Sequence, residues 1–321
     1  NLELRGEVFE IAAADRELID LGRAAGAACK LPGSGGCVLM VCRDTEHLAR
    51  VERACHAAGR KTLRPVVTRP APQLRAIFLA AGFATRLYPL TETQAKPLLE
   101  IAGAPMLTRI VAQVAAAGAV VDGVVVSNGK FHADFSAWGR SARAPLPLTI
   151  VNDGAMSNET RLGAIRDLAL GLEQMPPCAG VDGYLVMACD NLFDFDLSVL
   201  VERFRVASIG QLIVREVPSP VPPGRYSEVL LDGDRVTRFR EKPARPESDL
   251  SAIAVYLLPK ELPGLVQSYL ADDRNPDAPG HFLAWLSERV TLEATPLTGQ
   301  WLDIGSVADL EKAQSAFRDE A

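Results

Sequence analysis

Two cations, Arg86 and Lys96, follow closely on a short apolar run, residues 76–81, that we expect to be a strand. The turn between this strand and the arginine consists largely of small residues. Small side chains let backbone N–H groups approach a phosphate chain closely, and arginine and lysine neutralise its charge. The pattern predicts a nucleoside triphosphate site in which Arg86 and Lys96 are the catalytic cations and the nucleotide lies against Ala80, Ala81, Gly82 and Thr85.

A carboxylate stands at the end of a second apolar run, where Tyr184–Cys189 leads into Asp190. The carboxyl ends of parallel strands face the ligand crevice of an α/β fold, so we expect this side chain to reach the same site. Carboxylates are preferred ligands of Mg²⁺, which ties the phosphates of a nucleotide together. Asp190 is therefore a candidate metal ligand. An ordinary strand-end or helix-cap aspartate is the alternative.

The stretch Leu79–Leu90, LAAGFATRLYPL, and the stretch Ala95–Leu99, AKPLL, resemble the signature of the sugar-phosphate nucleotidyltransferases. That signature usually runs LAAGxGTRLxPLT and then PKPL. Ala84 replaces its second glycine, and Ala95 replaces the proline before the lysine. The first replacement is mild if the φ angle of Ala84 is negative and costly if that angle is positive.

The resemblance implies that an oxygen of a sugar 1-phosphate attacks the α-phosphorus of the triphosphate and releases pyrophosphate. Two further motifs are similar to motifs of this family. Trp301–Ser306, WLDIGS, implies that Asp303 is the second Mg²⁺ ligand beside Asp190. Glu241-Lys242-Pro243 implies that the glutamate binds sugar hydroxyls and that the lysine contacts the sugar phosphate. A solvated charge pair is the alternative for Glu241 and Lys242.

Two polar stretches, Asn152–Gly154 and Ser157–Leu162, precede a predicted helix. In the family this region faces the base and the ribose, which implies that Asn158 binds the nucleotide. The spacing of the asparagines is also similar to that in phosphocholine cytidylyltransferases. A helix N-cap with a capping box, supplied by Ser157 or Asn158, is the structural alternative.

Residues 25–39 resemble the third motif of the GHMP kinases, the family of galactokinase and of homoserine, mevalonate and phosphomevalonate kinases. The resemblance implies that a Gly-rich loop beside the phosphates and the substrate is formed by Gly33, Ser34, Gly35 and Gly36. A Gly-rich turn in an αβ sandwich is the alternative. The ATP-binding loop and the catalytic acid of that family are absent from this sequence. We therefore expect the C-terminal fragment of a kinase within a kinase–nucleotidyltransferase fusion, and no kinase activity from this chain alone.

The composition is that of an ordinary globular protein of about two domains, with 321 residues, 48% of them hydrophobic and 23% charged. A net charge of −6 argues against nucleic acid as a partner. No apolar run is long enough to span a membrane. The six cysteines and four histidines show neither disulfide nor zinc spacing, so we expect reduced thiols in a cytoplasmic protein. A homo-oligomer is left open.

Three prolines within residues 65–72 mark a break in the chain. We expect a GHMP kinase C-terminal fragment over residues 1–68, a Pro-rich linker over 69–73 and a nucleotidyltransferase domain over 74–321. A last strand of the first segment over residues 62–67 is the alternative. The first segment is interpreted as a small α+β sandwich. After the break, apolar runs alternate with helical patterns, which predicts a doubly wound, mostly parallel, Rossmann-like α/β sheet.

Three classes of function compete. The leading hypothesis is a Mg²⁺-dependent nucleotidyltransferase that converts an NTP and a sugar 1-phosphate into an NDP-sugar. The second is a cytidylyltransferase acting on phosphocholine or a similar phosphate ester, and the third is a non-catalytic, nucleotide-binding regulatory subunit. The set of Arg86, Lys96, Asp190 and Asp303 disfavours the third class. A fused sugar kinase, which would supply a sugar 1-phosphate, favours the first class over the second.

Overall fold

The computed structural model describes residues 11–32, 36–64, 70–141 and 144–317, and the chain divides into two units, Asn1–Thr68 and Arg69–Ala321. Each unit is described by itself. Residues 62–64 form no strand, and the remainder of the strand considered over 62–67 lies outside the described residues.

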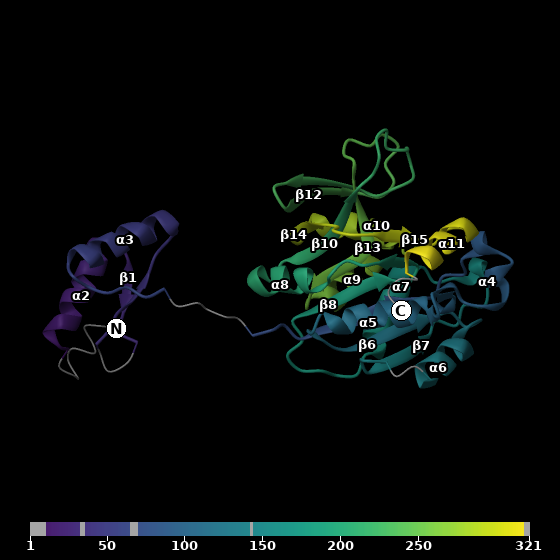
Figure 1. The fold of residues 1–321 in the computed structure, drawn as a ribbon, viewed down its shortest axis with the longest axis horizontal. Coiled ribbons are helices and arrows are strands. Elements are labelled where there is room, and N and C mark those ends of the chain that lie inside the picture. Colours follow the sequence, from purple (N-terminus) through teal and green to yellow (C-terminus); the bar gives the residue numbers. More distant parts are fainter. Residues whose placement is uncertain (1–10, 33–35, 65–69, 142–143, 318–321) are drawn as a thin grey trace. The chain divides into compact units, whose positions relative to one another are not determined.

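In its described residues, the first unit joins two helices to a two-stranded antiparallel sheet, drawn in purple in Figure 1. Gly33, Ser34 and Gly35 lie outside the described residues, whereas the N–H of Gly36 donates to the buried carboxylate of Asp15 at 2.9 Å. This is the small α+β arrangement that the sequence predicted. Its elements are α2 (Ala13–Ala24), β1 (Ala28–Lys30), β2 (Leu39–Val41) and α3 (Thr45–Ala57).

A nine-stranded sheet forms the centre of the second unit, in the order β11-β12-β14-β10-β13-β8-β3-β6-β7. Only β12 and β13 run against the direction of the other strands, so the predicted mostly parallel α/β sheet is confirmed. The strands are β3 (Leu74–Leu79), β6 (Val120–Ser127), β7 (Leu148–Asn152), β8 (Gly183–Ala188), β10 (Gly210–Glu216), β11 (Glu228–Asp232), β12 (Arg235–Arg240), β13 (Leu250–Pro259) and β14 (Leu292–Pro296).

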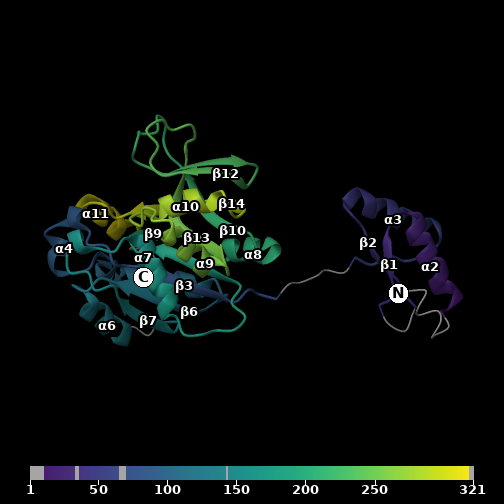
Figure 2. The same cartoon turned by 180° about the vertical axis from the view of Figure 1, so that it is seen from behind.

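Helices cover both faces of this sheet, which Figures 1 and 2 show from opposite sides. Successive side chains of β3 alternate between the faces: Phe78 belongs to one apolar cluster and Ile77 to the other. The first cluster is shared with α5 (Met106–Ala116), α6 (His132–Ser141), α8 (Ser198–Ala207) and α11 (Val307–Ala316). The second is shared with α7 (Ala164–Gln174), α9 (Leu262–Ala271) and α10 (Pro279–Ser287).

Short elements gather where the parallel strands β3, β6, β7 and β8 end. A small antiparallel sheet of β9 (Asn191–Phe193) and β15 (Trp301–Asp303) pairs residues that are far apart in the sequence. The others are the 3₁₀ turns η1 (Thr85–Leu87), η2 (Lys96–Leu98) and η3 (Asn158–Thr160), the short helix α4 (Leu90–Thr93), and the hairpin of β4 (Glu100–Ile101) and β5 (Ala104–Pro105).

A buried ion pair joins β3 to β6. Arg75 is 4% exposed, and its Nε and Nη2 donate to the two carboxylate oxygens of Asp122 at 2.6 and 2.8 Å. Its Nη1 donates to the carbonyl of Pro176 at 2.7 Å. The guanidinium therefore has both its charge and its donors satisfied inside the fold.

We expect Asp122→Ala to lower the free energy of unfolding by about 3 kcal/mol, because it leaves a buried guanidinium without its counter-charge. Urea denaturation measures the change. In Glu202→Ala, which removes an exposed partner of Arg205, the loss should stay below about 0.5 kcal/mol. Equal losses in the two variants would show that the buried Arg75–Asp122 pair stabilises the fold no more than an exposed ion pair does.

Candidate functional site

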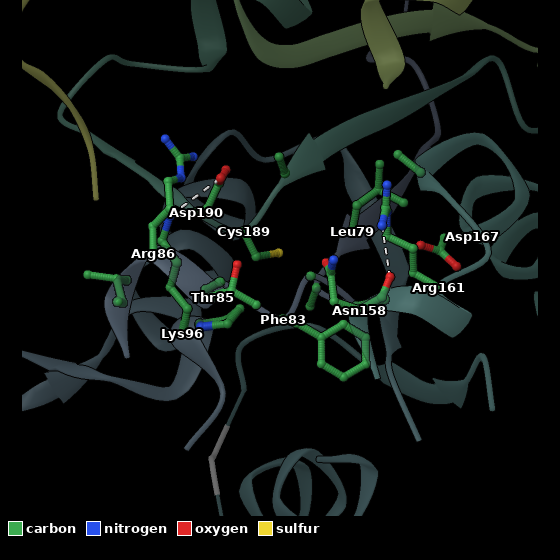
Figure 3. Close-up of a pocket in the computed structure, with 18 of the residues that line it drawn as sticks. Leu79, Phe83, Thr85, Arg86, Lys96, Asn158, Arg161, Asp167, Cys189 and Asp190 are labelled. Carbon is green, nitrogen blue, oxygen red and sulfur yellow. Dashed lines mark hydrogen bonds and ion pairs between the residues drawn. The ribbon is translucent and has the colours of Figure 1, made fainter. Parts of the chain in front are cut away.

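A pocket of about 380 Å³ opens at the carboxyl ends of β3 and β8 (Figure 3). Backbone from Leu79 to Leu87 forms one wall, so the turn after β3 lines the pocket as the sequence predicted. Arg86, Lys96 and Asp190 lie together on one side in Figure 3, and Asn158, Arg161 and Asp167 lie on the other. One end of the pocket thus carries two cations and a carboxylate, and the other end is lined by polar side chains.

Two buried polar side chains hold the turn after β3, and neither was singled out from the sequence. The side-chain amide of Asn128 donates to the carbonyl of Ala81 at 3.0 Å and accepts the N–H of Phe131 at 3.0 Å. The hydroxyl of Thr91 donates to the carbonyl of Ala84 at 2.8 Å. Both side chains are at most 1% exposed, so buried hydrogen bonds hold the backbone of the turn that lines the pocket.

Ala84 adopts the left-handed region, with φ 48° and ψ 43°. A Cβ in this region crowds the following carbonyl, at a cost of roughly 1–2 kcal/mol, so the replacement of glycine here is the costly case. Ala95, the other departure from the signature, has φ −64° and ψ 135°. That conformation is open to any residue and matches the φ of proline, so this replacement carries no backbone strain.

The ammonium of Lys96 lies between two carboxylates. Its Nζ is 3.4 Å from Oδ2 of Asp190 and 3.8 Å from Oδ1 of Asp303, and the residue is 7% exposed. The register of β15 on β9 places Asp303 opposite Asn191, whose side-chain amide donates to Oδ1 of Asp190 at 2.9 Å. The two aspartates, far apart in sequence, therefore meet at one point.

The carboxylate pair has the chemistry of a divalent-cation site. Burial and the charge of Asp190 raise the pKa of Asp303, an effect that Lys96 and Arg86 partly offset. A cation held by both carboxylates relieves this repulsion. Within the described ranges, no group of three or more His, Cys, Asp and Glu side chains could hold a metal. Because Mg²⁺ keeps several waters and binds substrate phosphates, two carboxylates are enough for it.

The loop at the other end of the pocket is built from Ser157 to Gly163. Ser157 caps η3 in a capping box with Thr160, which confirms the predicted helix cap at Ser157. Asn158 lines the pocket. The helix predicted after these polar stretches starts at Ala164, and the turn before it is 3₁₀.

A bidentate ion pair clamps this loop to the segment between α9 and α10. Nε and Nη2 of Arg161 donate to the carboxylate of Asp277 at 3.1 and 2.8 Å, and Nη1 donates to the carbonyl of Asn158 at 2.8 Å. Gly163, with φ 92°, permits the approach, because a Cβ there would lie 2.8 Å from the carbonyl oxygen of Pro276. The clamp joins residues 116 positions apart, and no sequence pattern predicts it.

Two carboxyl groups meet beside the pocket, where Asp153 follows β7 and Asp167 lies in the first turn of α7. Burial, followed by the charge and hydrogen bond of Asp153, raises the pKa of Asp167 to about 7. Burial also raises the pKa of Asp153, although hydrogen bonds from the backbone N–H groups of Ala155 and Gly129 oppose that rise. The pair is therefore most favourable when Asp167 is protonated, because its carboxyl group then donates a hydrogen bond to the carboxylate of Asp153.

Glu241 and Lys242 lie outside the first pocket. Glu241 lines a cavity of about 250 Å³, and Lys242 lines both that cavity and an adjoining one of about 510 Å³. The Glu241 side chain is 11% exposed, and Nζ of Lys242 is 3.4 Å from its Oε1. A Cβ on Gly280 would lie 1.8 Å from Oε2 of Glu241, so only glycine leaves room for this carboxylate. Asp303 lines the larger cavity, and Arg86 lines both that cavity and the first pocket.

Comparison with known families confirms both resemblances seen in the sequence. Residues 75–320 match the family model described as nucleotidyl transferase, and residues 1–61 match the model described as GHMP kinases C terminal. No helix in the described residues is both long enough and apolar enough to cross a membrane.

Curated relatives match over about three quarters of this chain. Glucose-1-phosphate thymidylyltransferase of Streptomyces griseus is 28% identical over 239 residues, 74% of this chain and 64% of that protein. UTP–glucose-1-phosphate uridylyltransferase of Synechocystis is 25% identical over 247 residues, 75% of this chain and 62% of that protein. The chain thus spans a little under two thirds of the length of these relatives.

Solved structures share the fold. A UDP-glucose pyrophosphorylase complexed with UDP-glucose superposes with a TM-score of 0.63 at 18% identity, covering 78% of this chain and all of that one. A UTP-bound enzyme of the same type from Acinetobacter baumannii has a TM-score of 0.61 at 20% identity, covering 78% of this chain and 94% of that one.

Ala84→Gly should raise the free energy of unfolding by about 1 kcal/mol, since the left-handed strain exceeds the added entropy of the unfolded chain. Ala95→Gly is the matched control. It should lower stability by about 1 kcal/mol, because it adds the same chain entropy, relieves no strain and removes a buried methyl group. Both changes are read from urea denaturation, and losses in both variants would contradict the assignment of strain to Ala84.

Asp167→Asn should remove a pH dependence of stability. Between pH 4 and 7 the unfolded state has released the Asp167 proton while the folded state keeps it, so the contribution of Asp167 to wild-type stability falls as pH rises and levels off above about 7. The amide keeps a donor toward Asp153 without the charge. The free energy of unfolding of the variant, relative to that of the wild type, should therefore rise across this range, by about 4 kcal/mol at most.

Thermal unfolding of the wild type and Asp167→Asn at half-unit steps from pH 4 to 8 measures that difference. Asp232→Asn, on the exposed end of β11, should follow the wild-type profile. A constant difference between Asp167→Asn and the wild type across the range would contradict the shared proton.

Proposed function

The chain belongs to the nucleotidyl transferase family, and from this premise we propose that it transfers a nucleoside monophosphate from an NTP to a sugar 1-phosphate. Pyrophosphate is released and an NDP-sugar is formed. One observation carries the proposal: Lys96, Asp190, Asp303 and Arg86 cluster where a polar pocket adjoins a second cavity. Two substrates bound in these two spaces would meet at the cluster.

We assign the first pocket to the triphosphate. Backbone at Ala80, Ala81 and Gly82 would approach the phosphates, and nothing lies within 4 Å of a Cβ position on Gly82, so the wall there is open. Arg86 and Lys96 would neutralise the phosphate charge. Asn158, at the far end of the pocket, would then face the base and the ribose.

The reaction needs no protein nucleophile. An oxygen of the sugar phosphate forms the new bond to the α-phosphorus, and the bond to the bridging oxygen breaks, so that its electron pair leaves with pyrophosphate. The chain would supply orientation and fixed charge, with Arg86 and Lys96 stabilising the charge that develops on the leaving group. Lys96 is already held by two carboxylates, so its ammonium needs no reorganisation.

Asp190 and Asp303 are the residues that would hold Mg²⁺, which when bound screens and ties together the phosphate oxygens. Glu241 and Lys242 would hold the acceptor, the glutamate at its hydroxyls and the lysine at its phosphate. Gly280 keeps the space that Glu241 occupies.

For the organisation of the chain, we propose a transferase over residues 74–321, a linker over 69–73 and a kinase C-terminal fragment over 1–68. The match of residues 1–61 to the kinase model supports the last assignment. A kinase unit that made a sugar 1-phosphate would raise its local concentration beside the transferase.

Pyrophosphate release from a panel of five nucleoside triphosphates, each with glucose 1-phosphate or phosphocholine, tests this function. We expect turnover with a sugar 1-phosphate and none with phosphocholine. Turnover with phosphocholine alone would favour the cytidylyltransferase alternative, and turnover with neither would favour the regulatory one.

Asp190→Asn and Asp303→Asn should each lower kcat/KM about a thousandfold, because losing one metal carboxylate removes several kcal/mol of transition-state stabilisation. Circular dichroism checks that each variant is folded. Asp232→Asn makes the same chemical change on the exposed end of β11 and should leave the rate within about twofold. Near-normal rates in both site variants at saturating Mg²⁺ would remove the metal assignment.

A further inference from the structure

The cavity of about 510 Å³ has far more positive than negative charge on its walls. Five of its lining side chains are cationic, and only two, Asp303 and Asp309, are acidic. One phosphate on the acceptor accounts for Lys242, and the triphosphate accounts for Arg86. The remaining cations are Arg215, Arg225 and Lys312. Lys312 is exposed and lies 3.9 Å from Asp309, so it has a partner.

Arg215 and Arg225 are held by aromatic rings instead of by carboxylates. The guanidinium carbon of Arg215 lies over Trp301 at 4.4 Å and over Tyr226 at 5.1 Å from the ring centroids. The guanidinium of Arg225 also lies over Tyr226, at 5.1 Å. Contacts with ring faces fix a guanidinium without using its N–H donors.

Neither arginine has an ion pair within the described parts of the chain. The sole hydrogen-bond acceptor found there for Arg215 is the carbonyl of Glu216, which Nη1 reaches at 3.3 Å. Arg75 and Arg240, in contrast, each pair with a carboxylate. Two positioned guanidinium groups with free donors form a site that fits a planar or tetrahedral anion, which they bind in bidentate fashion.

The arginine pair extends from the phosphate end of the larger cavity into the smaller one. Arg215, Arg225 and Lys242 line both the larger cavity and the smaller one beside Glu241 and Gly280. Arg86 and Asp303, where the transferred phosphate would react, line the larger cavity and not the smaller one. The arginine pair therefore reaches the space beside Glu241, which the sugar ring would occupy.

We propose that the acceptor is a sugar 1-phosphate carrying a second anionic group, which Arg215 and Arg225 bind. This inference rests on the proposed function, because it places the sugar ring beside Glu241. A carboxylate on the sugar and a second phosphate share the chemistry that two arginines recognise. A neutral sugar would leave both guanidinium groups without a counter-charge.

Three acceptors that differ at one carbon test the proposal: glucose 1-phosphate, glucuronic acid 1-phosphate and glucose 1,6-bisphosphate. We expect kcat/KM for one of the charged acceptors to exceed that for glucose 1-phosphate at least tenfold, and the better of the two identifies the group. Arg215→Gln and Arg225→Gln should each reduce this preference, the ratio of kcat/KM for the charged acceptor to kcat/KM for glucose 1-phosphate, about tenfold. Arg238→Gln, an exposed arginine of β12, is the matched control and should keep the full preference.

Equilibrium binding of the same acceptors, measured by titration calorimetry, separates this inference from the proposed function. If no acceptor is turned over but the charged ones bind tenfold more tightly in an Arg215-dependent way, the proposed reaction fails and the anion site stands. Equal binding of neutral and charged acceptors overturns the anion site. If both arginine variants lose affinity for all three acceptors equally, the anion site is also overturned, since the arginines would then bind the 1-phosphate or the triphosphate.

Discussion

The site depends on one buried ammonium. Lys96 is almost wholly enclosed, and a lone charge in that position would be costly to bury. Asp190 and Asp303 compensate its charge. The lysine in turn offsets the repulsion between these two carboxylates. This three-charge cluster joins the 3₁₀ turn η2, the end of β8 and the short strand β15. The nucleotide wall and the acceptor wall are thereby fixed to each other at the point where the reaction would occur.

Residues near one another in sequence were the easiest to place. The apolar runs before Gly82 and before Asp190 predict two strands with these residues at their carboxyl ends, and both residues line the pocket. Asp303 was placed through its motif, because β15 has only three residues and carries no periodic signal. Helices α9 and α10 were not predicted, since both consist mostly of apolar residues and contain few polar ones.

Long-range contacts account for what the sequence did not disclose. The clamp between Arg161 and Asp277 and the proton shared by Asp153 and Asp167 depend on how β7, α7 and the α9–α10 connection pack together. Asn128 supports the turn after β3 from the end of a neighbouring strand. Even for Ala84, which lies within the motif, the strain could be assigned only from the φ angle in the folded chain.

The two binding spaces draw on different stretches of the chain. Most of the first pocket comes from residues 79–190, whereas the two adjoining cavities come almost entirely from residues 215–312. Arg86 is the main residue of the earlier stretch that reaches across. Substitutions after β10 therefore alter the adjoining cavities and leave most of the first pocket as it is. Under the proposed function, sequence variation in that stretch would change the acceptor and keep the nucleotide.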